Sequence, residues 1–138
     1  MIADRFLPLL NKVRPTGDGR WIACCPVHDD KNPSMTITEA NESVLMNCHS
    51  CGANGKDVCD SLGLDSFELF GKDFNPNDYK KPRIPAADIL RCLDFEVMFL
   101  SCVNNQLSQG QPLTEKDKER LSVTSRRISN AMKAGGLS

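Results

Sequence analysis

The sequence predicts an α+β protein in which a small antiparallel sheet with flanking short helices precedes a C-terminal antiparallel helical hairpin. Two observations lead to this prediction. Between residues 20 and 48, short runs of apolar and β-branched residues alternate with polar turns, which is typical of antiparallel strands. From residue 86 onward, apolar residues recur every three or four positions, which is typical of amphipathic helices. The length of 138 residues suits one domain or two small ones.

The first predicted domain covers residues 1–70. Residues 1–13 predict a short helix because their apolar side chains fall at helical spacing, although Pro8 interrupts it. A glycine-containing turn is expected at residues 16–19. The three expected strands and the short helix after them lie at residues 20–24, 34–38, 43–48 and 55–62.

A linker and a helical hairpin are expected to follow. Residues 71–85 hold three prolines, one glycine and many polar residues, a composition typical of a linker. The second predicted domain, residues 86–138, begins with one helix over residues 86–107. Apolar residues on two sides of that helix predict burial on much of its circumference. After a polar break, a second helix is expected to begin at its N-cap Thr114 and to stop at Gly135.

Charge is distributed unevenly, although the formal net charge is only −1. Residues 1–62 carry a net charge of −2, residues 63–78 of −3 and residues 79–138 of +4. Electrostatic attraction to nucleic acid is therefore expected mainly from the second half of the chain. No apolar run approaches the roughly 20 residues that a membrane span needs, so we expect no membrane association and a cytoplasmic location.

Four residues have the spacing of a metal site. Cys25-x2-His28 and Cys48-x2-Cys51 are separated by nineteen residues, which is enough for a strand, a turn and a strand. Zinc prefers four such ligands in a tetrahedron, and two tight turns brought together by strands can supply them. In a cytoplasmic protein the seven cysteines are expected to be thiols or metal ligands. We therefore predict one structural Zn²⁺, with no open coordination position for catalysis.

The spacing leaves two substitutions in this ligand set open. Cys24 could replace Cys25, and His49 could replace either downstream cysteine. We favour the two x2 pairs because they match each other, and we expect His49 at the surface or beside the ligands. The remaining cysteines fall at helical spacing and are expected to be buried thiols: Cys59, Cys92 and Cys102.

Motifs around the four residues occur in a recognisable order. Cys25-Pro26-Val27-His28 is followed by Asp29 and Asp30, by Pro33-Ser34 before an apolar strand, and by the knuckle Cys48-His49-Ser50-Cys51-Gly52 with a short helix from Lys56. In this order they resemble the N-terminal zinc-ribbon domain of bacterial and phage DNA primases. The resemblance covers roughly residues 5–64.

This resemblance implies a small antiparallel zinc ribbon that touches single-stranded DNA template and helps to choose where primers start. In the family, a Toprim catalytic domain supplies acidic metal-binding motifs. Such motifs are not seen in this sequence, in which the predicted hairpin follows the ribbon. We therefore expect that the chain does not make primers by itself, and whether it is an enzyme stays open.

Two hypotheses of function follow. The first is a zinc-binding accessory or split subunit that recognises single-stranded DNA in replication priming, with Arg20, Trp21, Lys31 and Lys56 as candidate contacts. The competing expectation is core packing for Trp21 and a solvated surface for the lysines. The alternative is a scaffold, such as a phage or mobile-element regulatory factor. It would bind a primase catalytic subunit, a helicase, a host factor or a second copy of itself through residues 86–134.

Overall fold

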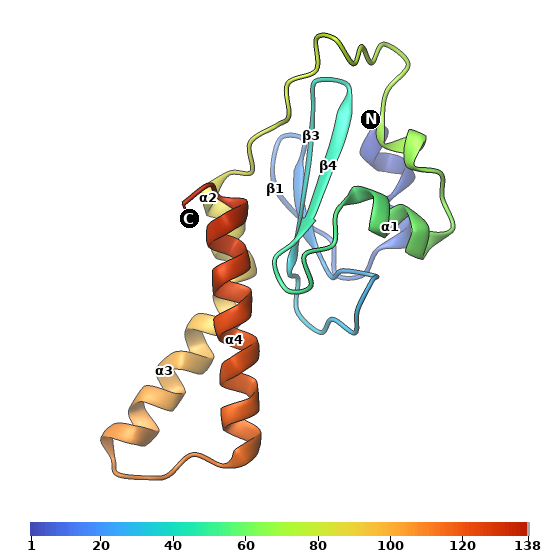
Figure 1. Cartoon of the computed structure of the whole chain (residues 1–138). Coiled ribbons are helices and arrows are strands. Elements are labelled where there is room, and N and C mark those ends of the chain that lie inside the picture. The colour runs from blue at the N-terminus through green and yellow to red at the C-terminus, as the bar shows by residue number, and fades with distance from the viewer. Residues whose placement is uncertain (138) are drawn as a thin grey trace.

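The computed structural model of the chain describes residues 1–137 and is built around a four-stranded antiparallel sheet (Figure 1). The strands follow one another in the order β1-β2-β3-β4. They are β1 Arg14–Gly17, β2 Arg20–Ala23, β3 Met35–Ala40 and β4 Ser43–Cys48. Helices lie on both faces of this sheet, which confirms the predicted α+β class. The edge strand β1 was not predicted, and it pairs with β2 through an irregular register at Gly17.

One face of the sheet carries the main apolar core. Ile37 pairs with Trp21 on one side and with Met46 on the other, so all three point to this face. Short helices from both ends of the ribbon cover it: η1 Ile2–Arg5, η2 Leu7–Leu9, α1 Gly55–Leu62 and η3 Ser66–Leu69. Phe6, which lies between η1 and η2, and Val58 of α1 are fully buried in this core.

The expected helix over residues 1–13 is wrong in its type. Two 3-10 turns replace it, and the second begins with Leu7 and Pro8. Proline has no amide proton and its ring crowds the preceding turn, so a continuous α-helix cannot pass through this position without a kink. The helix over residues 55–62, by contrast, has the predicted bounds and ends at Gly63, whose φ is 72°.

The other face of the sheet is covered by α2 Ala86–Cys92, which lies opposite α1 in Figure 1. Ile89 and Cys92 of α2 are buried, as are Ile22 and Thr36 on the strands beneath. This cover was not predicted. From the sequence, residues 86–107 were expected to form one continuous helix of a separate hairpin. Instead, the helix is interrupted at Leu93, whose φ and ψ are −95° and 1°, and α2 packs on the sheet.

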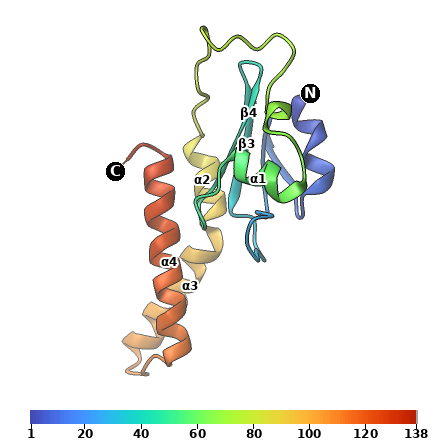
Figure 2. The ribbon, with the colours of Figure 1, turned by 45° about the vertical axis from the view of Figure 1, so that its right-hand side comes forward.

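Two longer helices, α3 Asp94–Ser108 and α4 Glu115–Ala134, then extend beyond the end of the sheet (Figures 1 and 2). We call residues 94–134 the helical arm. The start of α4 is as predicted: the Thr114 side chain accepts the amide of Asp117, and the Asp117 side chain accepts the amide of Thr114. The expected burial of the first helix is wrong, because only Glu96 and Val103 of α3 are buried. In residues 1–137, α3 packs beside α4 and has no second helix on its outer side.

Residues 71–85 form neither helix nor strand, as expected of a linker, but side chains fasten them to the ribbon. The rings of Phe70 and Phe74 lie 4.3 Å apart, and those of Phe74 and Tyr79 lie 5.2 Å apart. The amide of Asn41 donates to the Lys80 carbonyl at 2.7 Å. These contacts fix the path of the basic stretch that enters α2. Over the described residues, no helix is both long and apolar enough to cross a membrane.

Candidate metal centre

The fold brings the two halves of the predicted metal site together at one end of the sheet. Cys48 ends β4, and Cys25 lies just after β2. One ligand atom from each of Cys25, His28, Cys48 and Cys51 lies within 4.8 Å of the other three. Cys25, Cys48 and His28 are buried or partly buried, and Cys51 is exposed at the rim.

The spacing of these atoms fits a tetrahedral zinc ion. Zn–S bonds of about 2.3 Å and Zn–N bonds of about 2.0 Å place two sulfurs about 3.8 Å apart and a sulfur and a nitrogen about 3.5 Å apart. The Sγ atoms of Cys25 and Cys51 are 3.8 Å apart, and His28 Nε2 is 3.3 Å from Cys48 Sγ. Three thiols and one imidazole are also the donor set that zinc prefers. The cluster is therefore sized and composed for one structural zinc ion.

The second knuckle holds Cys48 ready to act as a thiolate. The backbone amides of Ser50 and Cys51 both donate to Cys48 Sγ at 3.4 Å. Gly52, with φ of 78°, lets the chain turn back after the knuckle. A hydrogen bond with the neighbouring Cys25 thiol is the largest reason that the pKa of Cys48 falls to about 3, and the same contact raises the pKa of Cys25. These contacts favour the thiolate form in which Cys48 binds zinc.

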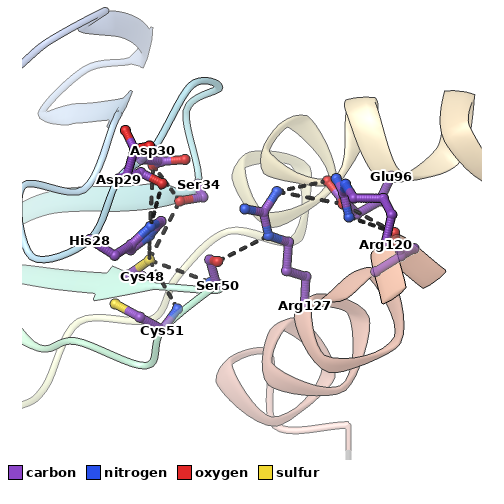
Figure 3. A network of polar contacts seen from close by, with 11 residues as sticks. His28, Asp29, Asp30, Ser34, Cys48, Ser50, Cys51, Glu96, Arg120 and Arg127 are labelled. Carbon is purple, nitrogen blue, oxygen red and sulfur yellow. Dashed lines mark hydrogen bonds and ion pairs between the residues drawn. The ribbon is translucent and has the colours of Figure 1, made fainter. Parts of the chain in front are cut away.

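Asp30 and Ser34 form hydrogen bonds with the residues of the metal site (Figure 3). Asp30 Oδ2 accepts the amide of Cys25 at 2.8 Å and the hydroxyl of Ser34 at 2.6 Å, and its side chain is 1% exposed. Ser34 Oγ lies 3.4 Å from Cys48 Sγ, so this pair connects both knuckles. Such contacts to ligands orient them and tune the metal. The sequence pointed to these two residues only through the primase resemblance, and it gave no role to either.

The orientation of His28 follows from its other ring nitrogen. Nδ1 lies 3.1 Å from the carbonyl oxygen of Asp29. A carbonyl only accepts, so Nδ1 carries the proton in this contact and Nε2 is left with a free lone pair toward Cys48. The backbone of Asp29 therefore sets the tautomer that a metal ligand needs, while its exposed carboxylate takes no part.

The two alternatives in the ligand set lie outside the cluster. Cys24 is buried, but it is not among the four residues whose ligand atoms gather. His49 is 1% exposed, so of its two expected positions, at the surface or beside the ligands, the first is wrong. Its Nε2 lies 3.3 Å from Thr36 Oγ1, and burial lowers the pKa of the imidazole. His49 therefore lies on the sheet face that α2 covers, next to Thr36.

The other three cysteines divide between core and surface. Cys59 and Cys92 are buried, as predicted, and burial raises the pKa of Cys92 to about 12. Cys102 is exposed on α3, so the prediction of a buried thiol is wrong there. The prediction assumed that another part of the chain would cover that side of α3, and in residues 1–137 no helix does.

The four residues predicted to contact nucleic acid do not form one surface cluster. Trp21 packs against the main core, which was the competing expectation for it. Arg20 is half-buried, and its guanidinium lies over Gly17. Lys31 and Lys56 are exposed, one in the loop between β2 and β3 and the other in the first turn of α1.

A polar network connects the second knuckle to the helical arm (Figure 3). Arg127 Nε donates to Ser50 Oγ at 2.9 Å, and its guanidinium also lies 3.3 Å from the carboxylate of Glu96. Arg120 pairs with the same carboxylate, which is 1% exposed. Asn130 Nδ2 adds a hydrogen bond to the Ser50 carbonyl at 3.1 Å. Sequence reasoning missed this network, because a glutamate within an apolar helix does not indicate which arginines it will meet.

Geometry and ligand chemistry together define a small zinc ribbon, and comparisons with known proteins place it more closely. Residues 10–63 match the family model of the CHC2 zinc finger. A DNA primase of Neisseria meningitidis is 33% identical over 57 residues, which are 41% of this chain and 8% of that protein. A DNA primase of Synechococcus elongatus is 41% identical over 49 residues, 34% of this chain and 7% of that protein. One from Escherichia coli is 36% identical over 47 residues, 34% of this chain and 8% of that protein.

Residues 10–63 are therefore a CHC2-type zinc ribbon, related to the ribbons of DNA primases, and they hold a structural zinc site. The match covers the sheet, both knuckles and α1, and leaves α2 and the helical arm outside it. The chain spans less than a tenth of the length of these curated relatives. No solved structure gives a significant match.

Proposed function

We propose that the chain binds single-stranded DNA as an accessory or split subunit in replication priming and is not catalytic alone. Cys25, His28, Cys48 and Cys51 hold one zinc ion that fixes the ribbon, and no coordination position is left for a substrate. The proposal divides the chain into residues 1–70 as the ribbon domain, 71–85 as a linker and 86–138 as a helical part. What carries it is the match of residues 10–63 to a zinc finger whose relatives are DNA primases.

The template-binding surface differs from the one that the sequence suggested. Because α2 covers the second face of the sheet and Trp21 packs in the core, little of either sheet face is left for stacking bases. Lys31 and Lys56 remain solvent-exposed cations that can meet phosphates. The strand is therefore expected to run along loops and edges, where each cation adds a salt-sensitive contact.

A titration of labelled single-stranded DNA with zinc-loaded protein tests this function. We expect saturable binding at low salt that weakens as salt rises, because phosphate contacts release counterions. Trp21 is the only tryptophan, so its fluorescence reports directly whether the strand reaches it. Absence of binding at low salt would remove the proposal. Primer synthesis by the purified protein alone would contradict the noncatalytic part.

The scaffold alternative has an observation of its own. Large apolar side chains are exposed along one side of α3: Val97, Leu100 and Leu107, with Met98 beside them. The spacing of the first three places them on one stripe of the helix. A stable dimer or a complex with a primase catalytic subunit or helicase, without DNA affinity, favours this alternative. A monomer with clear DNA affinity favours the first function.

A further inference from the structure

A cleft of about 820 Å³ opens between the ribbon and the end of α4. Leu45 and Asn47 of β4 form one wall, and the linker from Lys81 to Ile84 forms the second. The last turn of α4, with Asn130 and the residues that follow it, closes the third side. The cleft therefore lies where the zinc ribbon, the linker and the helical arm meet.

Three cations line this cleft and no acidic residue does. Lys81 and Arg83 come from the linker and Lys133 from α4. All three are exposed, and in residues 1–137 none of them has a carboxylate within ion-pair distance. The second hollow of the described chain differs, because Asp94 lines it and its Arg91 is paired with Asp88. Arg14 also lines the second hollow, so of the two the first cleft carries the larger uncompensated positive charge.

The cations come from backbone that is held in place. The Asn41 side chain binds the Lys80 carbonyl, so the residue before Lys81 is fixed against the β3–β4 turn. Pro82 restricts the backbone between Lys81 and Arg83. On the other side, Asn130 binds the knuckle at Ser50, which holds the turn of α4 that carries Lys133. Cations on anchored backbone lose less entropy when they bind an anion.

Two negative features face these cations, and they are the smaller effect. The C-terminal end of α4 carries roughly half a negative charge. The amides of Gly135, Gly136 and Leu137 bind carbonyls of that last turn, which satisfies part of it. Zinc with three thiolates contributes about one further negative charge beside Cys48. Three full positive charges exceed both, so the cleft remains attractive to an anion.

We propose that this cleft binds the phosphate backbone of a single-stranded nucleic acid, with Lys81, Arg83 and Lys133 as its phosphate contacts. The inference rests on the proposed function and gives it a surface that the ribbon alone lacks. The side-chain amide of Asn47 has no partner in the described residues and adds a donor at the same wall. A flexible single strand can bend into a recessed groove, whereas a duplex holds its phosphates on a rigid cylinder.

The test compares two triple variants of the full zinc-loaded chain that lose the same charge. One carries Lys81→Ala, Arg83→Ala and Lys133→Ala. The matched control carries Lys72→Ala, Lys116→Ala and Arg126→Ala, which remove exposed cations outside the cleft. Binding of a labelled single-stranded DNA is measured across a range of salt, and zinc content and circular dichroism check that each variant is folded.

The cleft variant is expected to bind about ten-fold or more weakly at low salt, and its salt slope is expected to fall by about 2 because each phosphate contact contributes about 0.7. The control is expected to stay within about two-fold of the wild type. Equal losses in both variants would overturn the cleft while leaving the proposed function in place. No binding by the wild type would overturn both. Tighter binding of a duplex than of a single strand would overturn the choice of ligand.

A third variant separates the effect of charge from the effect of side-chain packing. Lys81→Arg, Arg83→Lys and Lys133→Arg together keep all three charges and change the shape of each cation. Affinity within about three-fold of the wild type is expected, because point charges on flexible stems carry most of the attraction. A loss as large as that of the alanine variant would show that the cations do not act as phosphate contacts.

Discussion

The ribbon and the helical arm are neighbours in one chain, yet different forces hold them. The ribbon surrounds a continuous apolar core with Met35, Ile37 and Met46 at less than 2% exposure, and a metal site closes one end of its sheet. The arm has little apolar core. Its fully buried side chains are mainly polar, namely Glu96 and Thr124, and Ala131 at 2% exposure is small.

A buried carboxylate takes the place of an apolar core in the arm. Glu96 of α3 accepts hydrogen bonds from Arg120, Arg127 and Thr124 of α4. Arg120 also lies over the rings of Phe95 and Phe99, at 5.2 Å from each centroid. Such a pair specifies which helix faces meet, but it stabilises the fold less than apolar packing does. The ribbon therefore depends on its metal, and the arm depends on one buried charge.

Loss of zinc should cause the largest loss of stability, and this loss should fall on the ribbon. Cys48→Ala removes the central ligand, and structural zinc contributes on the order of 10 kcal/mol to small domains of this kind. We expect the variant to lose its zinc and the ordered sheet, as read by elemental analysis and NMR. Cys102→Ala is the control, because that thiol is exposed on α3. A Cys48→Ala protein that keeps one zinc per chain and its fold would show that the ligand set is wrong.

Loss of the buried charge should come next and should strike the arm. Glu96→Gln leaves Arg120 and Arg127 without their anion, which is expected to cost about 3 kcal/mol. Chemical denaturation followed by helix content measures this, and zinc content should stay at one per chain. Glu119→Gln, at an exposed position of α4, is the control. Release of the zinc by Glu96→Gln as well would show that the metal site depends on the charge network of the arm, contrary to this expectation.

The ribbon could be predicted from the sequence because its signals are local. Two ligand pairs, alternating strands and a glycine stop are each contained within a few residues, and the helix over 55–62 was placed without error. The strand β1 was missed because its residues, Arg14 to Gly17, include a proline and a glycine and carry no alternation. It forms because β2 offers an edge to pair with.

The arm could be predicted only as two helices, because its details depend on partners distant in sequence. The break at Leu93 arises where α2 stays on the sheet and α3 leaves it, and no glycine or proline marks it. Arg127 is one of the cations that give residues 79–138 their net charge of +4, from which attraction to nucleic acid was expected. The structure uses it on Glu96 and Ser50, 31 and 77 residues away in sequence. Local periodicity cannot show such pairings.

A smaller effect is expected from a residue that orients the zinc ligands but does not bind the metal itself. Asp30→Asn keeps the shape of the side chain but removes the charge that accepts the Cys25 amide and the Ser34 hydroxyl. Changes of this kind typically lower metal affinity about 10- to 100-fold. Competition with a chromophoric chelator measures the change. Asp29→Asn is the matched control, because only the backbone carbonyl of Asp29 contacts His28. Equal losses in both would mean that general charge, and not this contact, supports the site.

The smallest effect should test how firmly the two regions are joined. Asn130→Ala removes one hydrogen bond to the Ser50 carbonyl, which is expected to cost about 1 kcal/mol. Ser129→Ala, at the exposed residue that precedes Asn130 in α4, is the control.

Hydrogen exchange locates the change from Asn130→Ala. Faster exchange is expected in the last turns of α4 and at the knuckle amides, because both lose the same contact, with zinc affinity unchanged. Faster exchange confined to α4 would mean that the hydrogen bond from Asn130 stabilises the arm but not the knuckle.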